Sequence, residues 1–134
     1  MSSTPNATDT TDASLYRRLG GAEGISSLVD DIVDAHMKNP VIRSRFLPYR
    51  ETPEKLEEVK RHLCEFIEEG SGGPGSYSGS SMPEAHRGMN INEAEYVAAV
   101  DDIMDVLEAH EVGEQTRKDM LAIVYSLKDE IVHC

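Results

Sequence analysis

Two histidines, His62 and His86, stand on either side of a glycine-rich segment at residues 72–81. The segment opens with three glycines and a proline, which favour irregular and partly fixed backbone. Directly after it, the spacing of Met82, Ala85 and His86 places these side chains along one side of a short helix. An imidazole held in this way is a natural ligand for iron.

Zinc fits the two histidines less well. A zinc site needs three or four close ligands, and neither histidine belongs to a C-x-x-C or H-E-x-x-H spacing. A bulky planar cofactor with one or two axial ligands fits better. Of the other histidines, His110 and His133 lie near expected helix ends, where a partly cationic ring is favourable. His36 continues an apolar stripe, and we interpret it as a buried structural residue rather than a ligand.

The elements that position these residues are all predicted to be helices. Apolar residues recur at three- and four-residue steps, and no alternating run predicts a strand. Thr52-Pro53 and Asn92 mark helix starts. The predicted helices are a short turn at 15–19 ended by Gly20-Gly21, and residues 25–39, 41–47, 53–70, 93–107 and 114–131. Residues 1–12 are polar and aperiodic, so we expect a disordered tail before one all-α domain at 13–134.

Composition limits the possible partners. The 134 residues suit a single domain, and 25 acidic against 13 basic residues give a formal charge of −12. This charge works against binding nucleic acid or anionic membranes, and favours small molecules or a basic protein as partners. Acidic pairs such as Asp101-Asp102 are expected to form a solvated face. We interpret Cys64 and Cys134 as free thiols, and expect a cytoplasmic protein because no signal-like start or membrane span occurs.

A longer series of residues adds a specific resemblance. In chain order it comprises Tyr16-Arg17-Arg18-Leu19-Gly20-Gly21, Phe46, Phe66-Ile67, Gly72-Gly73-Pro74, Tyr77-Ser78-Gly79, Met82 and Ala85-His86. The order and spacing resemble those of group I truncated hemoglobins over about residues 15–132. The resemblance implies a globin-like two-over-two helical sandwich around heme b, which is iron protoporphyrin IX.

The same resemblance implies roles for individual residues. His86 resembles the proximal iron ligand, and Phe46 resembles the aromatic residue that packs on the porphyrin. The residues expected to form further pocket wall are Phe66, Ile67 and Met82. Tyr77 and Arg87 resemble positions that can reach a heme propionate, although either residue could instead be ordinary surface.

The distal side departs from the family pattern. Members that hold oxygen tightly place a tyrosine on the first long helix and a glutamine on the opposite helix. The matching positions here resemble Val33 and Leu63, with Val59 one turn earlier, and none can donate a hydrogen bond. Losing such a donor removes about 1–3 kcal/mol of stabilisation from bound oxygen. His62 is the remaining polar candidate, and we hypothesise a bis-histidyl heme with His86. Alternatively, His62 turns to solvent or pairs with a propionate.

These observations favour a heme protein that reversibly binds O₂, CO and NO, with a function such as oxygen transport. The enzyme alternative is NO dioxygenase or peroxidase-type activity, and a further alternative is electron transfer; both would use a separate reductase. A third hypothesis is a cofactor-free interaction module, which would have no need for His86 after the glycine-rich segment. We expect a monomer or a weak dimer.

Overall fold

The computed structural model describes residues 14–74 and 76–133 of the chain. The disordered tail expected at 1–12 lies outside these residues, as does Cys134. The helices are α1 (Leu15–Arg18), α2 (Gly21–Lys38), α3 (Arg43–Phe46), the 3-10 helix η2 (Leu47–Glu51), α4 (Pro53–Gly70), α5 (Met82–His86), α6 (Glu93–Ala109), α7 (Glu114–Ser126) and α8 (Lys128–Ile131).

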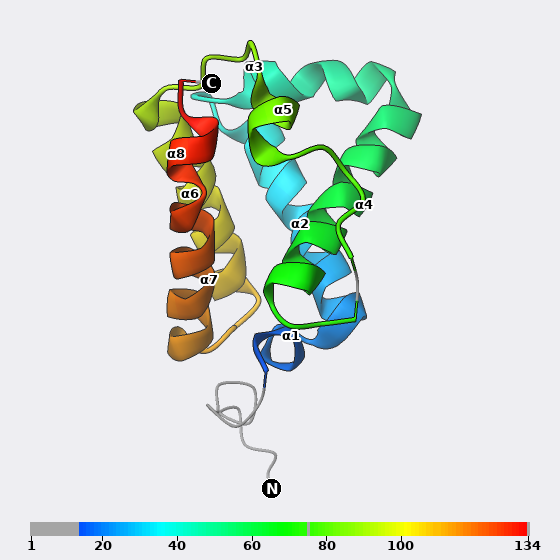
Figure 1. The fold of residues 1–134 in the computed structure, drawn as a ribbon, viewed down its shortest axis with the longest axis vertical. Coiled ribbons are helices and arrows are strands. Elements are labelled where there is room, and N and C mark those ends of the chain that lie inside the picture. The colour runs from blue at the N-terminus through cyan, green and yellow to red at the C-terminus, as the bar shows by residue number, and fades with distance from the viewer. Residues whose placement is uncertain (1–13, 75, 134) are drawn as a thin grey trace, which may run out of the picture.

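Two helix pairs build the molecule. Helix α2 packs against α4 to form one pair, and α6 packs against α7 to form the other. Helix α2 also packs on α6 and thereby joins the pairs, while α5 lies in front of α2 and contacts α8 (Figure 1). The predicted all-α, two-over-two arrangement is confirmed.

The core follows the apolar stripe of α2. Its buried residues recur at three- and four-residue steps, so one face of the helix meets both α4 and α6. Burying such side chains is the main favourable contribution to folding, at about 1.5–3 kcal/mol for each large aliphatic residue. The main cluster consists of Leu19, Ile25, Leu28, Val29, Ile32, Val33, Met37, Val106, Leu107, Val112 and Met120.

Helix α6 begins where the sequence predicts. Asn92 accepts a hydrogen bond from the backbone N–H of Glu95, and the Glu95 carboxylate accepts one from the N–H of Asn92. This capping box satisfies two amide groups that the helix itself leaves without partners. Helix α4 also begins as expected at Pro53, but the side chain of Thr52 makes no capping hydrogen bond.

Three local predictions needed correction. Gly20-Gly21 ends α1, yet Gly21 already starts α2, because Gly20 adopts a left-handed φ of 96° that turns the chain at once. The short helix expected at 41–47 is confined to α3, and the chain continues through Pro48 as η2. The helix expected at 114–131 is divided at Leu127, where the Ser126 hydroxyl donates to the Ile123 carbonyl at 2.6 Å and competes with the helix pattern.

No strand occurs in residues 14–74 and 76–133; one isolated bridge joins Ile91 to Val132. This bridge fastens the end of α8 to the segment before α6. None of the helices in the described part of the chain is long and apolar enough to cross a membrane.

Candidate heme site

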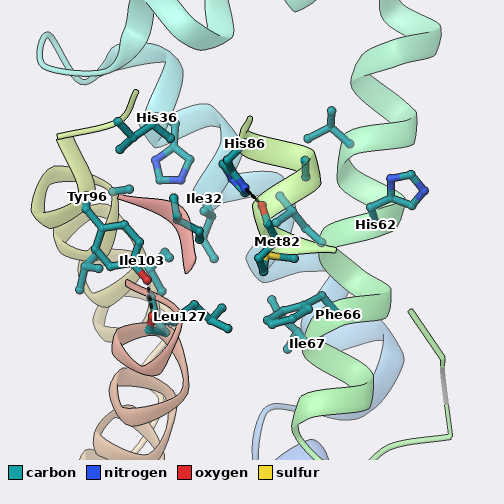
Figure 2. Close-up of a pocket in the computed structure, with 18 of the residues that line it drawn as sticks. Ile32, His36, His62, Phe66, Ile67, Met82, His86, Tyr96, Ile103 and Leu127 are labelled. Carbon is teal, nitrogen blue, oxygen red and sulfur yellow. Dashed lines mark hydrogen bonds between the residues drawn. The ribbon is translucent and has the colours of Figure 1, made fainter. Parts of the chain in front are cut away.

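A cavity of about 390 Å³ lies between the two helix pairs, with contributions from α2, α4, α5, α6, α7 and α8. Its lining is mostly aliphatic and aromatic. This volume falls within the range of roughly 300–1,000 Å³ that is typical of small-molecule and cofactor sites. Figure 2 shows Phe66, Ile67 and Met82 directed into the space from one side, and Tyr96, Ile103 and Leu127 from the other.

His86 enters the cavity at the end of α5. Ser81 caps this short helix by accepting from the Glu84 N–H at 3.3 Å, and Pro83 occupies its first turn. The Nδ1 atom of His86 lies 2.8 Å from the carbonyl oxygen of Met82 (Figure 2). Because a carbonyl can only accept, Nδ1 carries a proton, and in the neutral ring Nε2 keeps its lone pair. A ring oriented in this way is prepared to bind a metal through Nε2.

The glycine-rich segment that delivers α5 is tied to α4 by carboxylates. Glu65 accepts hydrogen bonds from the backbone N–H and the hydroxyl of Ser78, at 3.0 and 2.7 Å. Glu69 accepts from the Tyr77 N–H at 2.7 Å. The two hydrogen bonds from Ser78 hold the pKa of Glu65 below its usual range. At the start of the segment, Gly73 lies so close to the Tyr16 ring that a Cβ there would clash with it.

His62 lies on the edge of the same cavity but points away from it. In Figure 2 its ring projects from the outer side of α4, away from His86. It packs edge-on against Tyr77, with the ring centroids 5.9 Å apart. Tyr77 also packs on Phe66, and its hydroxyl donates to the Ser80 carbonyl. The structure therefore brings His86 into the cavity and places His62 at its rim.

The wall formed by α2 and α4 is apolar, as the sequence indicates. Val59 and Leu63 of α4 line the cavity. Val33 is only 2 % exposed but belongs to the core, whereas Val29 and Ile32 of the same helix line the cavity. These five side chains carry no hydrogen-bond donor.

His36 adds a polar group to this wall. Its side chain is 8 % exposed, it lines the cavity, and its Nδ1 lies 2.8 Å from Oδ2 of Asp102 on α6. Asn39 donates to the same carboxylate at 3.0 and 3.1 Å. Burial lowers the pKa of His36, although Asp102 acts in the opposite direction. The prediction of a buried His36 is confirmed, whereas Asp102 does not belong to a solvated face: its side chain is 13 % exposed.

Phe46 lines the cavity beside His36, with the ring centroids 4.9 Å apart. Next to it, Arg45 makes a two-pronged ion pair with Glu95, at 2.7 Å from Nε and 3.1 Å from Nη2. Arg45 also donates to the Met89 carbonyl at 3.0 Å. The pair holds the pKa of Glu95 below its usual range. It therefore fastens α3 to the start of α6 at the cavity wall, which sequence reasoning missed.

The remaining predicted residues lie elsewhere. Arg87 is exposed at the end of α5 and does not line the cavity. His110 caps the end of α6 and lies 2.6 Å from an Asp31 carboxylate oxygen near the surface. His133 is exposed, with a left-handed φ of 61°. Within the described ranges, no group of three or more His, Cys, Asp and Glu side chains could hold a bare metal ion.

Sequence reasoning also missed how Tyr96 is used. The predicted stripe of α6 includes Tyr96, but its hydroxyl reaches the Val124 carbonyl of α7, and burial raises the pKa of Tyr96 to about 12. The ring thus lines the cavity, and its hydroxyl is satisfied by the backbone of Val124, another lining residue. A tyrosine in a helix stripe gives no signal in the sequence for a partner 28 positions away.

The residues fit the planar cofactor that the sequence implies. An imidazole with its Nε2 lone pair stands in a cavity lined mainly by hydrocarbon, and the half-buried ring of Phe46 is available for stacking. Such a site suits a group that needs one strong axial ligand and an otherwise apolar surrounding. It does not suit a hydrated ion, which needs several polar ligands.

Comparison with known proteins agrees with this geometry. Residues 14–133 match the family described as bacterial-like globin. A group 1 truncated hemoglobin from Tetrahymena pyriformis is 28 % identical over 118 residues, covering 80 % of this chain and 93 % of that protein. Another from Chlamydomonas moewusii is 26 % identical over 132 residues, covering 97 % of this chain and 74 % of that protein.

Solved structures show the same fold. The truncated hemoglobin of Tetrahymena pyriformis in its Fe(III) form superposes with a TM-score of 0.82 at 18 % identity, covering 91 % of this chain and all of that one. The 2/2 hemoglobin of Synechococcus sp. PCC 7002, in the cyanomet state and with covalently attached heme, gives 0.77 at 21 % identity, covering 88 % and 95 %. The resemblance to group I truncated hemoglobins is confirmed, and the chain belongs to the bacterial-like globin family.

Proposed function

We propose that this protein binds heme b through Nε2 of His86 and reversibly takes up O₂, CO and NO. The observation that carries the proposal is the 2.8 Å hydrogen bond between His86 Nδ1 and the Met82 carbonyl, inside a cavity of apolar lining. When bound, heme would supply an iron that takes up diatomic ligands. Family membership supports heme-based ligand binding in general, and the particular ligands belong to the proposal.

The protein's own residues would orient the cofactor and exclude water. Ser81 and the carboxylates of Glu65 and Glu69 fix the segment that aims His86. Phe46 provides a ring for one porphyrin face, while Phe66, Ile67 and Met82 provide hydrocarbon for the rest. Tyr77 lines the cavity and Arg87 is exposed at the end of α5, and both would contact a heme propionate on this side. In a dry site of this kind, the few polar groups present have a large effect on bound ligands.

We further propose that His62 binds the iron in the unliganded protein. Its ring has one aromatic neighbour, Tyr77, and no hydrogen bond to the described residues, so little opposes its movement. It lies one turn from Val59 and Phe66 on α4, at the cavity edge. An external ligand would then displace His62 from the iron, and the displaced ring would pack against Tyr77.

Absorption spectra of the heme-reconstituted protein test both proposals. The ferric, ferrous and ferrous CO forms should be recorded for the natural sequence and for His62→Ala. Low-spin bands in both unliganded forms that become high-spin in His62→Ala would support His62 ligation. High-spin bands in the natural protein would leave His86 as ligand and exclude His62. Absence of heme uptake would overturn the proposed function.

The same sample tests heme type and catalysis. The chain has no C-x-x-C-H motif for thioether attachment, so acid extraction into organic solvent should remove the heme completely. Retention in the protein phase would indicate covalent attachment, as in the Synechococcus protein. Rapid loss of the oxy spectrum on adding NO, with repeated turnover when a reductant is present, would favour the NO dioxygenase alternative.

A further inference from the structure

We propose that His36 is a proton acceptor for protic ligands entering the heme cavity. The inference rests on the proposed heme function. It concerns a residue of α2, whereas His62 belongs to α4, and it concerns a proton transfer that the binding of O₂ or CO does not need. It starts from a buried imidazole that α2 contributes to an otherwise apolar wall.

The hydrogen bonds of His36 define which nitrogen can accept a proton. Its Nδ1 lies 2.8 Å from Oδ2 of Asp102, and a carboxylate accepts hydrogen bonds, so Nδ1 carries the proton in the neutral ring. Nε2 then keeps its lone pair. Among residues 14–74 and 76–133, no hydrogen-bond partner of Nε2 is found, although the side chain is 8 % exposed. A buried nitrogen of this kind is an open acceptor.

The position of His36 connects this acceptor with the cofactor site. His36 and His86 line the same cavity, and Figure 2 shows them entering its upper end from different helices. The ring of His36 lies 4.9 Å, centroid to centroid, from Phe46, the residue expected against the porphyrin. The neighbouring Val59 and Leu63 can neither give nor take a proton.

Burial, rather than the groups that surround the ring, favours its neutral, proton-accepting form. Asp102 faces it from α6, Asn39 holds that carboxylate from the end of α2, and Phe46 covers it from α3. Arg45 and Glu95 line the same cavity but neutralise each other as an ion pair. Burial lowers the pKa of His36 despite Asp102, so the neutral form is present at neutral pH. Once protonated, the ring forms an ion pair with Asp102.

Hydrogen cyanide illustrates the step. Its H–C bond breaks, the proton goes to Nε2 of His36, and the electron pair stays on carbon. The resulting cyanide anion is the species that binds ferric heme, while the imidazolium charge is balanced by Asp102. On dissociation the proton returns to the ligand. Carbon monoxide has no proton to lose, so its binding gives a matched comparison.

Stopped-flow kinetics of the ferric protein test the step. We expect His36→Gln, which keeps a donor for Asp102 but removes the base, to slow hydrogen cyanide association at neutral pH by roughly 100-fold, the lower end for general base catalysis. The two proteins should bind cyanide at the same rate at alkaline pH, because hydrogen cyanide is already ionised in solution there. Association of CO with the ferrous variant should slow far less than that of hydrogen cyanide. His110→Gln, which removes the exposed pair with Asp31, is the control and should change neither rate.

With the heme-bound protein, three results would overturn the proposal: an unchanged cyanide rate in His36→Gln, an equal loss in the cyanide and CO rates, or a change of spin state showing that His36 is itself a ligand. Nitrogen NMR of the heme-free natural protein gives a separate readout. It should show His36 protonated at Nδ1 and titrating below an ordinary histidine; protonation at Nε2 would contradict the proposal. Failure of heme uptake would overturn the proposed function. The NMR measurement on the heme-free protein would still test the protonation state of His36.

Discussion

The two sides of the cavity hold their histidines in different ways. On the α5 side, His86 is fixed by a backbone carbonyl one turn earlier in its own helix. On the other side, the ring of His62 contacts Tyr77 and makes no hydrogen bond to the described residues, whereas His36 is fixed by a carboxylate from α6. A ring fixed by a carbonyl is oriented to bind a metal, and a ring without a hydrogen bond can move. A ring paired with a carboxylate can accept a proton, because the carboxylate balances the positive charge.

The largest expected effect comes from removing the fixed ring. His86→Gly should weaken heme affinity by more than about 100-fold, because changing even a partner outside the ligand set commonly costs 10- to 100-fold. Transfer of heme to an excess of apomyoglobin measures the change. Added imidazole should restore part of the affinity in the cavity that glycine leaves. Equal heme retention in the variant and the natural protein would show that another residue holds the iron.

A donor added to the apolar wall should affect oxygen next most strongly. Val59→Gln places an amide at the cavity lining, and a hydrogen bond to bound oxygen of about 1–3 kcal/mol corresponds to roughly 5- to 150-fold slower dissociation. Flash photolysis and stopped-flow mixing measure this rate. Val59→Leu is the apolar control. If Val59→Gln and Val59→Leu gave the same rate, position 59 would not face the ligand.

The Arg45–Glu95 pair should contribute to stability rather than to ligand chemistry. Glu95→Gln weakens the two-pronged contact and should lower the free energy of unfolding by about 1–2 kcal/mol. Because the folded pKa of Glu95 is depressed, its stabilisation is present above the unfolded pKa and is lost as pH falls through the folded pKa. Urea unfolding at several acidic pH values measures both effects. A variant with the same acid sensitivity as the natural protein would exclude this role.

A smaller effect is expected from the contact that holds His62 outward. Tyr77→Leu removes an aromatic pair of about 0.5–1.5 kcal/mol, which should raise the low-spin, His62-bound fraction by roughly 2- to 10-fold. Tyr77→Phe keeps the ring and serves as the control. Spin-state spectra measure the fraction. A larger shift in Tyr77→Phe than in Tyr77→Leu would mean that the hydroxyl, rather than the ring, controls His62.

The smallest expected effect is the contribution of His36 to the pH dependence of stability. Because burial depresses the pKa of His36, its contribution to stability is present above the unfolded value of 6.5 and is lost as pH falls through the folded value. His36→Gln should therefore flatten the fall of unfolding free energy below about pH 6.5. Chemical denaturation at a series of pH values measures the slope. An unaltered slope would assign the pH dependence to other groups.

The contrast between the histidines also explains what the sequence could predict. His86 was identifiable because its partner lies four residues away and its helix follows a distinctive glycine-rich segment. The stripe of α2 likewise predicted the core, since helical periodicity is local. The partnership of His36 with Asp102 joins positions 66 residues apart, so Asp102 resembled any solvated acid. The outward position of His62 depends on a rotation of about 100° around α4, which corresponds to one residue. Helical periodicity in the sequence does not define the direction of a side chain that closely.

Local backbone details were missed for a related reason. The start of α2 at Gly21 and the change to η2 through Pro48 depend on how the chain must turn to pack, rather than on local residue preference alone. The break between α7 and α8 coincides with a serine hydroxyl that donates to a carbonyl of its own helix. The Arg45–Glu95 pair is 50 residues apart and becomes visible only when α3 meets α6.

A crystal structure of the ferric protein with bound heme tests the central claim most directly. The account predicts iron at about 2 Å from Nε2 of His86, as for other metal–imidazole bonds, with the hydrogen bond from Nδ1 to the Met82 carbonyl still in place. Iron bonded to another side chain in place of His86, or a heme lying outside the cavity between the two helix pairs, would contradict it.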